Sequence, residues 1–162
     1  MLAAFAQVRE QHPDAQLDLV GGHPPIAQPG VVAHGRLSLA RAEDRERIKG
    51  LYRTATAFVM PSLHEPAGLV YIEAGGAGVP SIGTTNGGAA TMIGPGGILV
   101  DPLAPDQIYA AMLALAEPNR ARRLGELAYE HSKLFTWHKV AERLIRAIGL
   151  RDVDVSGLAE FL

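Results

Sequence analysis

The sequence of 162 residues contains no cysteine and no long hydrophobic run. The absence of cysteine excludes disulfides, thiolate nucleophiles and zinc–thiolate sites. Every apolar run is well short of the roughly 18 residues that a membrane span needs, and the first ten residues have neither the basic start nor the apolar block of a signal peptide. We therefore expect a cytoplasmic protein, and leave open whether it associates peripherally with the inner membrane.

A strong excess of charge of one sign is also lacking. The 15 lysine and arginine residues are balanced by 17 aspartate and glutamate residues, which gives a formal net charge of −2. The basic cluster of Arg120, Arg122 and Arg123 is closely followed by glutamates, as on a solvated helix face. We therefore expect no nucleic-acid partner. The hydrophobic content of 48% suits one compact domain with a real core.

Several common enzyme motifs are absent as well. His64-Glu65 begins like the helix of a zinc protease, but Gly68 takes the place of the second histidine and Pro66 would interrupt the helix. No serine lies in a G-x-S-x-G elbow, and no glycine-rich stretch matches a dinucleotide or Walker motif. The six histidines show no ligand spacing. The sequence therefore predicts no metal site.

What the sequence does contain is a regular alternation of strand and helix patterns. This alternation predicts an α/β fold with a doubly wound parallel sheet, Rossmann-like in its layers, with right-handed crossovers. The expected strands are 17–20, 31–37, 57–62, 80–85 and 97–100, the second of them interrupted by His34-Gly35. The expected helices are 1–11, 39–55, 68–78, 89–93, 105–116, 119–134 and 137–148.

The most informative stretch follows the expected strand at 57–60. This strand enters a proline-bounded loop, and a helix pattern begins near Gly68 and carries Glu73 on its second turn. Ligands of open α/β sheets bind where the carboxyl end of a strand feeds the amino end of a helix. The helix start attracts a phosphate, and Gly68 lets the ligand approach the backbone. Glu65 and Glu73 supply acceptors for neutral hydroxyl groups.

These residues resemble a known family pattern. The matching segments are Glu65-Pro66-Ala67-Gly68-Leu69-Val70-Tyr71-Ile72-Glu73-Ala74, then Gly78-Val79-Pro80-Ser81, then Gly87-Gly88. In this order they resemble the carboxyl-terminal, donor-binding domain of retaining GT-B glycosyltransferases of family 4, also called group 1. The resemblance covers nearly the whole chain and implies a single domain over 1–162, with terminal helices and a tail at 134–162. Phe135-Thr136-Trp137 is similar to the family's F-S-W entry to those helices, and we expect Trp137 to pack them against the sheet.

The resemblance also assigns roles to residues, each with an ordinary alternative. Glu65, taken as the catalytic residue, would touch the donor sugar and stabilise developing positive charge. Glu73 would bind the ribose hydroxyls, although a lone helical glutamate is most often a solvated surface residue. The remaining donor-binding residues implied are Gly68, Leu69, Val70, Ala67, His64, Arg36, Leu37 and Thr84. The ordinary interpretation of Gly68 to Val70 is that they start a helix. In the same way, His64 would be an ordinary loop histidine and Arg36 an exposed arginine at the end of a strand.

The sequence departs from the family pattern at several places. Ala67 replaces an aromatic residue, and Thr91 replaces an acidic residue. Gly75-Gly76 replace bulkier residues, and each costs the helix roughly 1 kcal/mol of stability relative to alanine. The family's amino-terminal domain and the first strand of this domain, with its Arg and Lys for the diphosphate, lie before the point where this sequence begins. We expect a gap between the strands at Leu17 and Val59, closed by a swapped segment or a dimer contact, with Asp152-Val153-Asp154-Val155 as one candidate filler.

The function implied by the resemblance is that of a glycosyltransferase of the hexosyltransferase type. Such an enzyme transfers a glycosyl group from a nucleoside diphosphate sugar to a carbohydrate or other hydroxyl acceptor, retains the anomeric configuration, and needs no metal or other cofactor. The implied partners are an amino-terminal GT-B domain or a swapped homodimer. Two alternatives stay open: a non-catalytic nucleotide-binding or assembly module, and a GT-B sugar-nucleotide epimerase.

Overall fold

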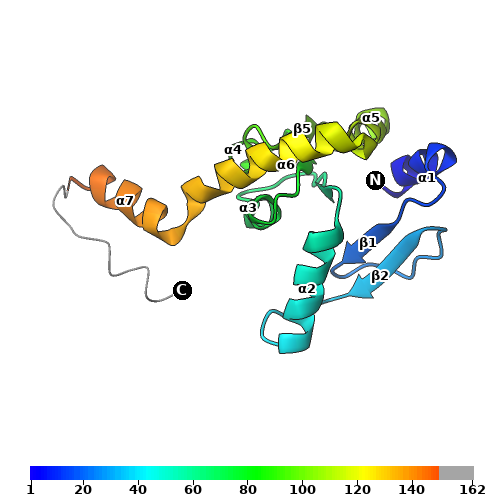
Figure 1. The fold of residues 1–162 in the computed structure, drawn as a ribbon, viewed down its shortest axis with the longest axis horizontal. Helices are drawn as coiled ribbons and strands as arrows, with labels where there is room; N and C mark the ends of the chain where they lie inside the picture. Colours follow the sequence, from blue (N-terminus) through cyan, green and yellow to red (C-terminus); the bar gives the residue numbers. More distant parts are fainter. Residues whose placement is uncertain (150–162) are drawn as a thin grey trace.

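The computed structural model describes residues 1–149, whose arrangement is shown in Figure 1. Strands and helices alternate along these residues, as the sequence predicts. The strands are β1 (Leu17–Val20), β2 (Val31–Gly35), β3 (Phe58–Met60), β4 (Ser81–Thr84) and β5 (Gly97–Val100). The helices are α1 (Leu2–Gln11), α2 (Ala42–Thr54), α3 (Leu69–Gly76), α4 (Ala89–Ile93), α5 (Pro105–Ala116), α6 (Pro118–Ser132), the 3-10 turn η1 (Lys133–Phe135) and α7 (Trp137–Ala147).

The strands form two parallel sheets rather than one continuous sheet. β1 pairs with β2 in one sheet, and β3, β4 and β5 follow in that order in the other. The α/β class and the parallel direction of the strands are therefore as predicted. The break between the sheets lies between β1 and β3, which is where the family resemblance implied a gap.

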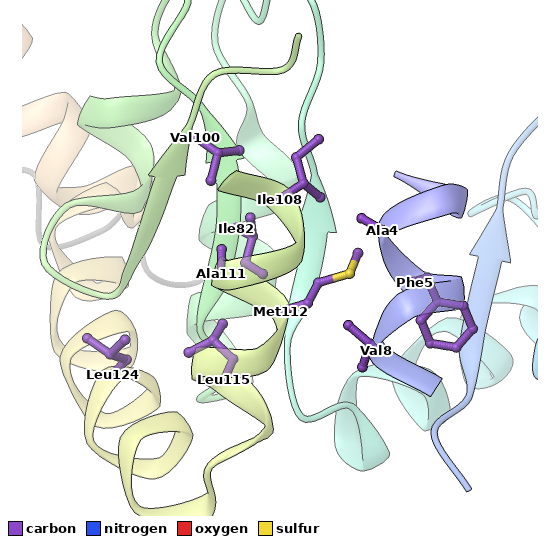
Figure 2. Close-up of a cluster of buried hydrophobic side chains, with 10 residues drawn as sticks. All are labelled: Ala4, Phe5, Val8, Ile82, Val100, Ile108, Ala111, Met112, Leu115 and Leu124. Atoms are coloured by element: carbon purple, nitrogen blue, oxygen red, sulfur yellow. The ribbon is translucent and has the colours of Figure 1, made fainter. Parts of the chain in front are cut away.

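One hydrophobic core connects the two sheets (Figure 2). Phe5 and Val8 of α1 pack with Met112 and other residues of α5, and the cluster includes Ile82 of β4. The opposite face of the three-stranded sheet is covered by α3 and α4, where Tyr71 packs with other apolar side chains. The sheet of β3, β4 and β5 is therefore covered on both faces, as expected of a doubly wound fold.

Several element ends differ from the sequence prediction by one to three residues, and two of these differences have a clear local cause. β2 ends at Gly35, whose φ of +67° is left-handed and breaks the extended conformation, so the strand stops short of Leu37. α2 begins at Ala42 rather than at Leu39. The Asp44 carboxylate accepts the backbone N–H of Ser38 at 2.8 Å, which holds the residues before the helix in a turn.

The prediction that Trp137 packs the terminal helices against the sheet is wrong. Its side chain is 68% exposed, and α7 extends beyond the rest of the fold (Figure 1) and packs against η1. The candidate filler Asp152-Val153-Asp154-Val155 lies outside the described residues. Within residues 1–149, no helix has the length and apolar character that crossing a membrane would require.

Candidate functional site

The candidate site is built around the connection from β3 to α3. Gly68 precedes α3 with a φ of +74°, a left-handed conformation that residues with a side chain rarely adopt. A Cβ atom at this position would lie 2.6 Å from Cδ2 of Tyr71 and 3.1 Å from Cγ of Glu65. Glycine is therefore required both by the backbone conformation and by the close approach of these two side chains.

A second loop, after β4, is joined to this connection. Glu65 and Gly87 form an isolated parallel bridge, in which the Gly88 N–H donates to the Glu65 carbonyl at 2.7 Å. The Asn86 side chain donates to the Leu63 carbonyl at 3.0 Å. Side chains at Gly87 or Gly88 would collide with the backbone of Glu65 or Pro66. The two strand-to-helix loops therefore form one connected surface at the carboxyl ends of β3 and β4.

The two carboxylates predicted from the sequence lie on either side of Gly68. Glu65 is half-buried in the loop, and its Oε1 accepts the Ala67 backbone N–H at 3.4 Å, a long contact. Glu73 is exposed on the second turn of α3, with Oε2 3.5 Å from the Tyr52 hydroxyl. Among the described residues neither carboxylate forms an ion pair, so both keep accepting capacity for a ligand.

A tyrosine lies close to each of these carboxylates. Burial, together with the negative charge of Glu65, raises the pKa of Tyr71 to about 12. The Tyr71 hydroxyl donates to the Met60 carbonyl at 2.7 Å, which fixes α3 to the end of β3. Burial, together with the charge and hydrogen bond of Glu73, likewise raises the pKa of Tyr52 to about 12. Both hydroxyls therefore stay protonated at neutral pH.

The start of α3 offers backbone N–H groups that no side chain of residues 1–149 caps. Gly68 has no side chain with which to accept them, and the first turn begins with Leu69 and Val70. The starts of α1, α2, α4 and α5 are likewise without a side-chain cap, whereas at the start of α6 the Glu117 carboxylate accepts two backbone N–H groups, at 2.9 and 2.7 Å. The amino end of α3 can therefore accept an anionic ligand on its own backbone.

The other predicted site residues fall into two groups. Thr84 is fully buried at the end of β4, where its hydroxyl accepts the Asn86 N–H at 3.1 Å, and His64 is exposed in the β3–α3 loop. Arg36 and Leu37 directly follow β2 in the other sheet. The Arg36 guanidinium lies over Gly22, where a Cβ atom would be 3.1 Å from its Nε. The described structure has no hydrogen bond or ion pair between Arg36 and the β3–α3 loop.

Two residues of this site were not predicted from the sequence. Asn86 links the two loops, and Tyr52 of α2 lies beside Glu73. The turn Asn86-Gly87-Gly88 was a recognisable signal for the first, but nothing in the sequence relates Tyr52 to a glutamate 21 positions later. Within residues 1–149, no group of three or more potential ligand side chains is arranged to hold a metal ion.

Comparison with known proteins supports the relationship that these residues suggested. The family model described as glycosyl transferases group 1 matches residues 1–118. The chain belongs to this family. A D-inositol 3-phosphate glycosyltransferase from Segniliparus rotundus is 31% identical over 157 residues, which cover 90% of this chain and 35% of the relative.

Solved structures of glycosyltransferases have the same fold. A sucrose-phosphate synthase from Thermosynechococcus elongatus superposes with a TM-score of 0.71 at 32% identity, over 90% of this chain and 40% of the other. A pneumococcal O-GlcNAc transferase superposes with a TM-score of 0.70 at 21% identity, over 91% of this chain and 31% of the other, which shows a shared fold. The chain thus spans about a third of the length of the curated group 1 relatives that it matches.

Proposed function

We propose that this chain is the donor-binding domain of a retaining glycosyltransferase that takes its sugar from a nucleoside diphosphate. The parent reaction transfers the glycosyl group to an acceptor hydroxyl and keeps the anomeric configuration. The observation that carries the proposal is the uncapped start of α3 between Glu65 and Glu73, in a chain of the group 1 family. A fold alone would not support an activity.

The start of α3 suits the diphosphate. The backbone N–H groups of Leu69 and Val70 would donate to phosphate oxygens, and the positive end of the helix dipole would stabilise their charge. Gly68 presents no side chain between the ligand and these groups. The proposal assigns this helix end the role that a cation has in other nucleotide sites, so it includes no metal and no other cofactor.

The two carboxylates suit the hydroxyl groups of the nucleotide sugar. Glu73 would accept hydrogen bonds from the two ribose hydroxyls, since the residue is exposed and its side chain has just one hydrogen bond within residues 1–149, the 3.5 Å contact with Tyr52. Glu65 would contact the hydroxyls of the donor sugar. As an anion at the loop, it would also stabilise the positive charge that develops on the sugar during transfer.

A second candidate function is nucleotide binding without transfer. It is favoured by the break between the two sheets, because an incomplete sheet would hold Arg36 and the β3–α3 loop loosely relative to each other. Sugar transfer by this chain together with a separately supplied acceptor domain would favour the first candidate. Binding without transfer under every such pairing would favour the second.

The donor proposal is tested by calorimetric titration of the chain with UDP, GDP and ADP, and by repeating the titration on Glu73→Ala. We expect saturable binding of one nucleotide, which the substitution weakens about tenfold, or roughly 1.4 kcal/mol, because the ribose loses a two-oxygen acceptor. Glu126→Ala is the matched control. It removes an exposed carboxylate from α6 and should leave the affinity unchanged.

Two results would contradict the assignment. Equal loss of affinity in the Glu73 and Glu126 variants would show a general charge effect rather than a contact. Binding that does not respond to Glu73→Ala at all would place the nucleotide away from α3.

A further inference from the structure

Tyr52 brings a phenol hydroxyl from α2 to the exposed carboxylate of Glu73 on α3. Its oxygen lies 3.5 Å from Glu73 Oε2, at the outer limit of a hydrogen bond, and has no other hydrogen-bond partner within residues 1–149. The Glu73 carboxylate forms no ion pair in the same part of the chain. Among the described side chains, the Tyr52 hydroxyl is therefore the group that can restrain this carboxylate.

The Tyr52 ring is itself held by a row of aromatic side chains. It packs on Phe58 of β3, with ring centroids 6.2 Å apart and ring planes inclined at 49°. Phe58 in turn meets the edge of the buried Tyr71 ring, with centroids 5.7 Å apart. Aromatic pairs at such separations are favourable. The core on this face of the three-stranded sheet thus positions the ring that presents the hydroxyl to Glu73.

The pair of Tyr52 and Glu73 keeps the capacity to bind a ligand. Burial, together with the charge and hydrogen bond of Glu73, raises the pKa of Tyr52 to about 12, so the hydroxyl keeps its proton at neutral pH and is the donor. An ionised carboxylate has about four lone-pair sites. Tyr52 uses one of these sites, which leaves enough acceptor capacity for two ribose hydroxyls.

A glutamate without such a restraint is a poorer ligand group. Its side chain has several rotatable bonds, and fixing them when a ligand binds costs conformational entropy. A donor that already holds one carboxylate oxygen lowers this cost before the ligand arrives. The contact of 3.5 Å can also shorten in the complex, since hydrogen bonds of functional sites are often long before the ligand binds.

We propose that Tyr52 is a positioning residue of the donor site, which orients the Glu73 carboxylate toward the two ribose hydroxyls and so makes the site prefer a ribonucleotide over its 2′-deoxy form. This inference rests on the proposed donor function. It adds to that function a residue from α2 and a chemical criterion by which the site selects its ligand.

The test measures the affinity of the chain for UDP, GDP and ADP, and for their 2′-deoxy forms, by calorimetric titration. Tyr52→Phe should weaken binding of the ribonucleotide about three- to fivefold, because the ring and its packing remain and only the hydroxyl is lost. The preference for the ribonucleotide over the deoxynucleotide should fall from about tenfold to about threefold. Tyr129→Phe removes a hydroxyl from a ring on α6 that is 46% exposed, and as the matched control it should change neither value.

A double-mutant cycle separates positioning from a structural effect. In the Glu73→Ala background, Tyr52→Phe should change the affinity by less than about 1.5-fold, because the group that Tyr52 orients is gone. An equal loss of affinity in both backgrounds would overturn the proposal, since it would make Tyr52 a packing residue.

The same measurements separate failure of this inference from failure of the donor proposal. Binding that Glu73→Ala weakens and Tyr52→Phe does not would overturn the inference alone. A preference for the ribonucleotide that is absent from the unchanged protein, or is the same in Tyr52→Phe, would do so as well. Binding of none of the three nucleotides, or binding that ignores Glu73→Ala, would overturn the donor proposal and this inference with it.

Discussion

Gly68 sets the geometry of the proposed donor site through a single backbone conformation. Its left-handed φ of +74° turns the chain from the loop that carries Glu65 into the helix that carries Glu73. The same residue lies against the Tyr71 ring, so the position is restricted by conformation and by space. A change at this one residue is expected to affect stability and binding together.

We expect Gly68→Ala to lower the free energy of unfolding by about 2 kcal/mol or more. The left-handed conformation costs roughly 1–2 kcal/mol for a residue with a Cβ atom, and the contact with Tyr71 adds to this cost. Urea denaturation measures the change. The control is Gly50→Ala in α2, where a Cβ atom meets nothing within 4 Å and alanine favours the helix. Equal stability of the two variants would contradict the packing described for Gly68.

Ionisation of Tyr71 makes the free energy of unfolding depend on pH in the alkaline range. Burial and the Glu65 charge raise its pKa in the folded state to about 12, from the ordinary value of 10.0. The unfolded chain therefore loses this proton at lower pH than the folded chain does. The contribution of the Tyr71 hydroxyl to the free energy of unfolding is complete below pH 10 and is lost as the pH rises towards 12.

Tyr71→Phe tests this dependence. At neutral pH the variant should be less stable by about 1 kcal/mol, because the hydrogen bond to the Met60 carbonyl is lost. The deficit should shrink as the pH rises through the range from 10 to 12, since phenylalanine does not ionise. Urea midpoints measured across this range for both proteins provide the comparison. A difference in stability between the two proteins that stays constant up to pH 12 would show that the pKa of Tyr71 is the same in the folded and unfolded chains.

At the scale of elements, the packing of α3 on α6 gives the neighbouring glycines Gly75 and Gly76 different surroundings. A Cβ atom at Gly75 would lie 2.8 Å from the Ala128 carbonyl oxygen, whereas one at Gly76 would meet nothing within 4 Å. From the sequence, both glycines were expected only to weaken the helix. The structure shows that Gly75 also allows the close approach of the two helices.

The two alanine substitutions are therefore expected to have opposite effects. Gly75→Ala should destabilise the protein by about 1–3 kcal/mol, because the helices must separate. Gly76→Ala should stabilise it by about 0.5–1 kcal/mol, because alanine loses less backbone entropy in a helix. Each variant serves as the control for the other in thermal or urea denaturation. Effects of the same sign would contradict this account of the α3–α6 contact.

Element positions were largely predictable from local signals. The helix at Pro105–Ala116 begins with a proline in its first turn and carries an apolar stripe, and its bounds agree with the prediction. The carboxyl end of β2 and the start of α2 were less well predicted. The first depends on the left-handed conformation of Gly35, and the second on the hydrogen bond between Asp44 and Ser38. The interruption expected at His34-Gly35 was a partial signal for the first feature, whereas nothing in the sequence shows the second.

At the scale of the whole molecule, the sequence could not show which apolar surfaces are covered. The apolar positions of α7 predict a helix with one hydrophobic face, but coverage depends on a partner surface. Trp137 was expected to pack on the sheet, but no partner surface covers it among the described residues and its side chain is exposed. The contact between Tyr52 and Glu73 was hidden for a related reason, since it joins two helices that only the tertiary fold brings together.

The break between the sheets was the more successful expectation at this scale. The family resemblance implies a gap between Leu17 and Val59. The structure has its two sheets on either side of that gap. The proposed donor site, in contrast, lies on one side only, because Glu65, Gly68 and Glu73 belong to the connection that follows β3.

The account of function depends on a nucleoside diphosphate binding at the start of α3. Backbone amide NMR of the chain during a nucleotide titration tests this binding most directly. We expect the largest shift changes at Leu69, Val70 and Gly88, because the first two would donate to phosphate and the third lies in the loop joined to Glu65. The amides of Asn119 and Arg120, already bound by Glu117, should not move. Saturable changes concentrated at other amides, with Leu69 and Val70 unaffected, would contradict the claim.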